Sequence, residues 1–114
     1  FWCGFYMVHD DKLIVGPYQG PVACQVLQNT GVCLAAVNQN QSIVVPDVHK
    51  FPGHIACSSL SRSEITVPLV DGQGVTRLVL DIDSTSLDDF DWVDQQYLEK
   101  MIALLSSSIH PIHL

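Results

Sequence analysis

The sequence has little positive charge. Five lysines and arginines stand against twelve acidic residues, which leaves a formal net charge of −7. Because a nucleic-acid-binding surface needs concentrated Lys and Arg, we expect no nucleic-acid partner. No apolar run approaches the roughly 18 residues that a membrane helix needs, so we expect no membrane partner either.

The sequence does not begin with methionine, and we expect that its first residues are not a secretory leader. Residues 1–6 carry neither a basic cluster nor a small-residue cleavage site, so we expect a cytoplasmic protein, and a chain that is a piece of a longer one. In a reducing compartment cysteines are thiols, metal ligands or catalytic groups rather than permanent cross-links. The four cysteines are therefore candidates for chemistry: Cys3, Cys24, Cys33 and Cys57.

Length and composition favour a single domain over residues 1–114. Apolar residues make up 47% of the chain and charged residues 15%, which excludes a disordered chain. Short apolar or alternating runs between turn residues predict strands at 5–8, 13–15, 22–27, 42–45, 64–70 and 75–82. With a helix at the end of the chain, this order predicts an α+β fold with an antiparallel sheet.

Two helices are predicted, at residues 32–37 and from residue 91 to about residue 109. Thr30 is placed to cap the first helix and Asp91 the second, with Asp94 in a capping-box position. The apolar residues of the second helix fall on one face at helical spacing: Val93, Tyr97, Leu98, Met101, Ile102 and Leu105. Residues 47–63 lack periodicity, and a loop of that length in a small domain is usually functional.

A cysteine in this long loop, Cys57 of the stretch His54-Ile55-Ala56-Cys57, is a candidate nucleophile. A thiol on a polar loop can be exposed, and exposed thiols near hydrogen-bond donors tend to be reactive. The alternative is that Cys57 is a small buried hydrophobic residue with no chemical role.

Asp81 and Asp83 form a pair at the end of a predicted strand. Strand alternation points both carboxylates to one side and Ile82 to the other. Like charges on one face repel, so one carboxyl is expected to keep its proton near neutral pH. Glu64 opens the partner strand of this hairpin and is expected to lie close to both. The alternative is a solvated strand end that leads into a turn.

A zinc site and an aromatic wall are weaker hypotheses. His49, His54 and three cysteines could be combined into a ligand set, but no two ligands have the close spacing of structural zinc sites, so we expect no metal. Trp2 and Tyr6 fall on one face of a strand. They are either core aromatics or a wall for a small apolar ligand.

At these residues the sequence resembles the free methionine-(R)-sulfoxide reductases, a family with the GAF fold. The most specific stretches are residues 51–57 and 61–65. Further similar stretches follow the same order along nearly the whole chain: 2–6, 16–20, 22–24, 31–33, 45–49, 81–84 and 90–91. The resemblance implies a GAF-like antiparallel sheet flanked by helices, from which the family's N-terminal helices are missing here.

The resemblance also implies roles for individual residues. The catalytic cysteine falls on Cys57, the resolving cysteine on Cys24 and a further, less essential thiol on Cys33. The substrate-side residues are three carboxylates and two aromatic rings: Glu64, Asp81, Asp83, Trp2 and Tyr6. Cys3 falls at a variable position and receives no role.

The implied reaction is the reduction of free methionine-(R)-sulfoxide, a repair of oxidative damage without a cofactor. A Cys57 thiolate attacks the sulfoxide sulfur, and a protonated carboxyl delivers a proton to the oxygen. Methionine leaves, and Cys24 condenses with the resulting sulfenic acid to a disulfide. A dithiol such as thioredoxin then reopens it. The sequence leaves open whether the protein is a homodimer.

Two residues depart from the family pattern, because Leu34 and Leu78 stand where the family has glycine. A leucine at a site of close backbone approach is expected to crowd the pocket. Two other functions remain open: a GAF domain that only binds a small molecule, and an inactive fragment that keeps the residues without their geometry.

Overall fold

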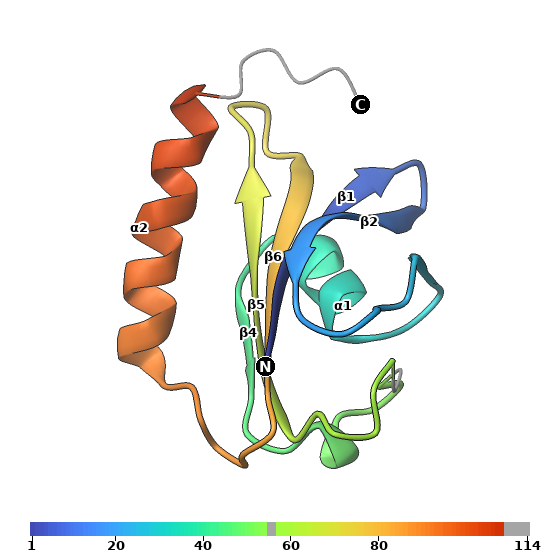
Figure 1. Ribbon diagram of the computed structural model, residues 1–114. Coiled ribbons are helices and arrows are strands. Elements are labelled where there is room, and N and C mark those ends of the chain that lie inside the picture. Colours follow the sequence, from blue (N-terminus) through green and yellow to red (C-terminus); the bar gives the residue numbers. More distant parts are fainter. Residues whose placement is uncertain (55–56, 109–114) are drawn as a thin grey trace.

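Six antiparallel strands form one sheet with a helix against each face (Figure 1). The computed structural model describes residues 1–54 and 57–108. The sheet order is β3-β2-β1-β6-β5-β4. The elements are β1 (Trp2–His9), β2 (Lys12–Gln19), β3 (Val26–Gln28), α1 (Val32–Gln39), β4 (Ile43–Val45), the 3-10 helix η1 (Val48–Lys50), β5 (Ser63–Val70), β6 (Thr76–Ser84) and α2 (Trp92–Ser108). The predicted α+β class and antiparallel sheet are confirmed.

Side chains alternate between the two faces of the central strands, which gives each face its own core. Leu78 and Leu80 of β6 and Ile65 of β5 pack under α2 with Ile102. The opposite face carries a second cluster, in which Val79 packs with residues of β1, β2 and α1. Consequently, alternate residues of β1, β5 and β6 point toward α1 rather than α2.

The helix caps illustrate one correct and one wrong prediction. Asp91 Oδ1 accepts bonds from the backbone N–H groups of Val93 and Asp94, and Asp94 Oδ2 accepts one from Asp91, so the predicted capping box is confirmed. Helix α1 instead begins after Gly31, whose φ of 120° suits glycine, and no side chain caps it. The predicted Thr30 cap is therefore wrong. Residue 109, where the last helix was expected to end, lies outside the described residues.

Helix α2 buries a narrower apolar face than its spacing predicts. Ile102 is buried and Leu98 packs beside it, whereas four members of the predicted face are exposed: Val93, Tyr97, Met101 and Leu105. A helix lying along one face of a sheet buries only the stripe that faces the strands. No helix within the described ranges has the length and apolar character needed to cross a membrane.

The predicted strand at residues 22–27 is too long. The strand paired with β2 spans only Val26–Gln28, preceded by one backbone hydrogen bond from Val15 N–H to the carbonyl of Gln25. The preceding residues instead leave the plane of the sheet and run across the α1 face, where side chains of β1 contact them. This detour brings Cys24 to the candidate site.

Candidate active site

A cavity of about 60 Å³ opens between the α1 face of the sheet, the start of α1 and two connecting segments. Its floor is formed by side chains of β1, β5 and β6, and its rim includes Ala23 and Cys57. Since one water occupies roughly 10–15 Å³ on this measure, the cavity has room for a small organic molecule. Seven of the predicted site residues line it, and Cys24 is joined to it by the disulfide to Cys57.

Strand register brings the three carboxylates together at the cavity. Glu64 of β5 is the direct cross-strand partner of Asp83 of β6, and Asp83 is in turn the partner of Trp2 of β1. Asp81 lies two residues earlier on the same face. Glu64 and Asp81 are each only 5% exposed, so the alternative of a solvated strand end is wrong.

Burial of this cluster favours the protonated carboxyls. Loss of hydration raises the pKa of Glu64 to about 7 and, together with the charge of Asp81, raises the pKa of Asp83 to about 8. The pKa of Asp81 lies well above its usual range for the same reason, with repulsion from Glu64 added. Near neutral pH the cavity therefore holds carboxylic acids that can donate protons.

The cluster leaves one polar atom without a partner at the cavity. Asp81 Oδ1 is fully buried and makes no hydrogen bond to the described residues. Cys33 stands next to it, and burial with the nearby carboxylates raises the pKa of this thiol well above its usual value. Cys33 is thus a neutral thiol in this setting, and Asp81 has an oxygen available to a bound molecule.

The metal ligands considered from the sequence are not brought together as one set within the described residues. Cys24 and Cys57 are joined in a disulfide and cannot serve as thiolate ligands. Within residues 1–54 and 57–108, the group whose donor atoms lie within 4.8 Å of one another is Cys33, Glu64 and Asp81. This group coincides with the acid cluster of the cavity.

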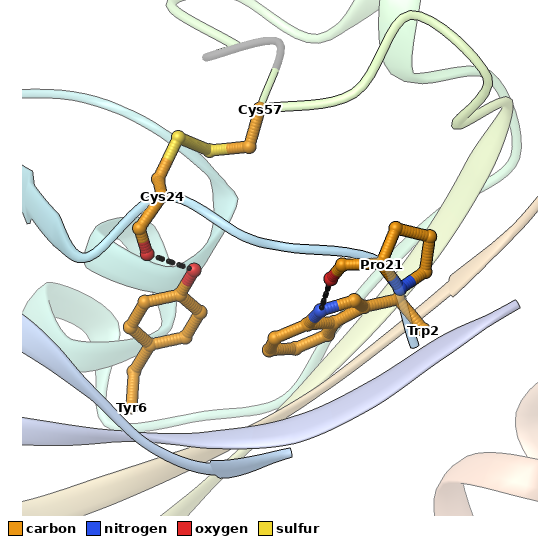
Figure 2. The surroundings of a disulfide bond; sticks show 5 residues. All are labelled: Trp2, Tyr6, Pro21, Cys24 and Cys57. Atoms are coloured by element: carbon orange, nitrogen blue, oxygen red, sulfur yellow. Dashed lines mark hydrogen bonds between the residues drawn. A yellow bond between two sulfur atoms is a disulfide. The ribbon is translucent and has the colours of Figure 1, made fainter. Parts of the chain in front are cut away.

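The cavity mouth carries a disulfide between Cys24 and Cys57 (Figure 2). Their Cα atoms are 5.4 Å apart, which confirms the expectation that the two thiols lie within disulfide range. Cys57 is exposed, so the alternative of a buried hydrophobic cysteine is wrong. Residues 55 and 56 of the loop motif lie outside the described residues.

Two aromatic side chains of β1 form one wall of the cavity. Trp2 and Tyr6 are 5% and 2% exposed, and their rings stack with centroids 5.8 Å apart. Trp2 Nε1 donates a hydrogen bond to the carbonyl of Pro21, and the Tyr6 hydroxyl donates one to the carbonyl of Cys24 (Figure 2). These residues serve both the core and the cavity wall, so the two interpretations of the aromatic pair do not exclude each other.

Two cavity residues escaped the sequence analysis as site residues. Ser61 Oγ donates to Asp83 Oδ1 at 3.3 Å, and His54, considered only as a metal ligand, lines the cavity. Burial lowers the pKa of His54, so its imidazole favours the neutral form. Neither has a local pattern that could reveal it, because each reaches the cavity only through the path of the loop.

Leu34 and Leu78 do not crowd the cavity as expected. Leu34, a residue of α1, packs in the core on the α1 face of the sheet, and Leu78 points to the opposite face, under α2. Neither side chain lines the cavity. Cys3, to which no role was assigned, also lies outside the lining and is exposed.

Similarity to known proteins agrees with this geometry. No protein-family model matches the chain. It is 50% identical to GAF domain-containing protein A of Dictyostelium discoideum over 109 residues, 94% of this chain and 68% of that protein. It is 45% identical to the free methionine-R-sulfoxide reductase of Saccharomyces cerevisiae over 111 residues, 94% of this chain and 62% of that enzyme.

A solved structure gives the same answer for the fold. The reduced form of fRMsr of Staphylococcus aureus matches with a TM-score of 0.89 and 41% identity, covering 95% of this chain and 70% of that one. The chain therefore spans roughly two thirds of the length of the relatives it matches. The GAF fold, the acid cluster and the cysteine pair occur together in a chain that belongs to the free methionine-R-sulfoxide reductase family.

Proposed function

We propose that this protein reduces free methionine-(R)-sulfoxide to methionine, with Cys57 as nucleophile and Cys24 as resolving thiol. The observation that carries the proposal is the Cys24–Cys57 disulfide at the mouth of a cavity with three buried carboxyls. A sulfoxide reductase needs both parts, because oxygen must be protonated to leave and the oxidised sulfur must then be resolved. A domain that only binds a small molecule needs neither.

The first step uses the thiolate and the acid together. The Cys57 thiolate attacks the sulfoxide sulfur while a carboxylic acid protonates the sulfoxide oxygen. The sulfur–oxygen bond of the sulfoxide breaks, methionine leaves with its sulfur reduced, and the oxygen with its proton is transferred to the Cys57 sulfur as a sulfenic acid. Asp83, with a pKa of about 8 and a hydrogen bond from Ser61, is the proposed proton donor.

The other cavity residues hold the substrate in this proposal. Trp2 and Tyr6 contact its methyl and methylene groups, and Asp81 offers its unpartnered oxygen to a polar group of the amino acid. Glu64, with a pKa of about 7, is partly ionised near neutral pH and can pair with the substrate ammonium. The Cys33 thiol lines the base of the cavity as a neutral group and has a secondary role.

The second step closes the disulfide and releases water. The Cys24 sulfur bonds to the Cys57 sulfur, the sulfur–oxygen bond breaks, and the thiol proton of Cys24 leaves with the hydroxide. A thioredoxin-like dithiol then exchanges with the disulfide and becomes oxidised itself. We place the protein in the cytoplasm, where such dithiols are kept reduced. A homodimer and a single domain over residues 1–114 stay predictions.

The proposal is tested by measuring methionine formed from each epimer of free methionine sulfoxide with dithiothreitol as reductant. We expect methionine from the R epimer and not from the S epimer. Cys57→Ser should form none while retaining its circular dichroism spectrum, because a hydroxyl is a far weaker nucleophile than a thiol. Binding of the sulfoxide without turnover would identify a sensor domain, and a folded chain that does neither would be an inactive fragment. Either result would overturn the proposal.

A further inference from the structure

The segment that carries Cys24, residues 20–25, contacts the sheet in two ways. Its last residue, Gln25, accepts a backbone hydrogen bond from Val15 N–H of β2 at 2.9 Å, and side chains of β1 bond to residues before it. We call this segment the strap. It follows the end of β2 at Gln19 and ends where β3 starts at Val26. Two of its backbone carbonyls accept hydrogen bonds from β1, Pro21 from the Trp2 indole at 3.1 Å and Cys24 from the Tyr6 hydroxyl at 2.9 Å (Figure 2).

Both donors are held rigidly, which makes them suitable anchors. Trp2 and Tyr6 are almost fully buried, stack on each other, and extend from a strand paired on both sides. Burial beside Asp81 raises the pKa of Tyr6, so its hydroxyl keeps the proton that it donates. The outer surface of the strap is solvated, with Val22 83% exposed. The anchors therefore act on the inner side only.

We propose that Tyr6 is a positioning residue for the resolving step, holding the Cys24 thiol within reach of oxidised Cys57 through the carbonyl of the same residue. This inference rests on the proposed function. The bonded carbonyl and the thiol belong to one residue, so the hydrogen bond fixes the backbone from which the sulfur extends. Holding two reacting groups at contact distance raises their effective concentration, and a released strap loses that advantage.

The inference separates two steps that one residue could affect. As part of the cavity wall, Tyr6 contacts the substrate and influences the reduction step. Through the strap, it influences disulfide formation after methionine has left. Only the second influence requires the hydroxyl, because the ring alone supplies the apolar wall. Tyr6→Phe keeps the ring and removes the strap bond, so it isolates that role.

The first experiment compares the rates of the two steps in a single turnover. Reduced protein is mixed with one equivalent of free methionine-(R)-sulfoxide without reductant, and methionine release and disulfide formation are followed by rapid quench. Dimedone traps the sulfenic acid for mass spectrometry. We expect Tyr6→Phe to lower the ratio of the disulfide-formation rate to the methionine-release rate by about 10-fold, the scale of one lost hydrogen bond. An unchanged ratio would overturn the inference.

Tyr18→Phe is the matched control. Tyr18 stacks on Trp2 at 5.3 Å and loses the same atom in this substitution, but it is 38% exposed and does not line the cavity. Its ratio should equal that of the wild type. An equal fall in both variants would mean that the aromatic stack, not the strap bond, controls the step, which contradicts the inference.

A second measurement does not depend on catalysis. The reduced and oxidised forms of the protein are equilibrated in glutathione buffers of known ratio, and the Cys24–Cys57 disulfide is quantified. Tyr6→Phe should lower the effective concentration of the two thiols by about 10-fold, again with Tyr18→Phe unchanged. An effective concentration unchanged in Tyr6→Phe would refute the inference even if the proposed function were correct. If Tyr6→Phe lowers the effective concentration but the wild-type protein does not reduce the sulfoxide, the proposed function is refuted and the positioning role of Tyr6 is supported.

Discussion

Replacing Glu64 with glutamine should change how the stability of the fold depends on pH. Its pKa rises from 4.5 to about 7 because the carboxyl is buried. Between these values the folded protein holds a proton that the unfolded chain has released. The free energy of unfolding therefore falls as pH rises from about 4.5 to above 7, and below 4.5 Glu64 contributes no pH dependence.

The magnitude follows from the pKa difference. A rise from 4.5 to about 7 corresponds to about 3 kcal/mol of stability lost on going from low pH to pH 8. Glu64→Gln removes this loss of stability. It also removes the charge that raises the pKa of Asp81, and this second change likewise makes stability less dependent on pH. We expect the variant to lose about 3 kcal/mol less stability than the wild type over this interval.

Urea unfolding at pH 5, 6.5 and 8 provides the assay, with a phosphine reductant keeping all cysteines as thiols. Glu99→Gln is the control, since it makes the same change at an exposed position on α2. Because Glu99 lies outside the acid cluster, Glu99→Gln should leave the contribution of Glu64 to the pH dependence in place. If the pH dependence of Glu64→Gln matches the wild type, the burial argument for the acid cluster is wrong.

Two further changes test other parts of the site. Asp83→Asn should slow methionine release by roughly 10²-fold or more, the scale for losing a positioned acid. The wild-type rate of this step should decline as pH rises through about 8, where Asp83 loses its proton. Asp83→Asn should lack that decline. Rapid-quench measurements of methionine release from pH 6 to 9.5 check both expectations. Gly4→Ala should lower stability by about 1–3 kcal/mol, because its Cβ would collide with the Tyr18 side chain and the Trp2 ring. Urea unfolding measures this, and an unchanged midpoint would contradict the packing described.

The β5–β6 hairpin and the capping box of α2 could be predicted from the sequence, because residues close together in the chain determine both. The turn at residues 71–74 predicted the β5–β6 hairpin, and alternation placed Asp81 and Asp83 on one face with Ile82 on the other, as the structure confirms. The pairing of Glu64 with Asp83 followed from the same hairpin. The capping box of α2 is equally local, since Asp91 and Asp94 lie within one turn.

Features decided by tertiary contacts were not predictable. The apolar residues before Val26 read as a strand, but the hydrogen bonds from Trp2 and Tyr6 divert them from the sheet. The prediction that Thr30 caps α1 was reasonable from the local sequence, but the helix begins after Gly31 and has no side-chain cap. Ser61 reaches Asp83 from the end of the loop, two residues ahead of β5, where the Arg62 N–H bonds to the carbonyl of Ser84. No spacing in the sequence encodes this contact.

The chemistry assigned to Cys57 and Cys24 is tested most directly by one stoichiometric measurement. Fully reduced protein is given excess free methionine-(R)-sulfoxide without any reductant, and methionine and free thiols are counted together. The proposed reaction predicts one methionine per chain, the loss of two thiols, and a peptide map that joins Cys24 to Cys57. Methionine release without thiol loss, or a map that joins Cys33 to Cys57, would contradict it.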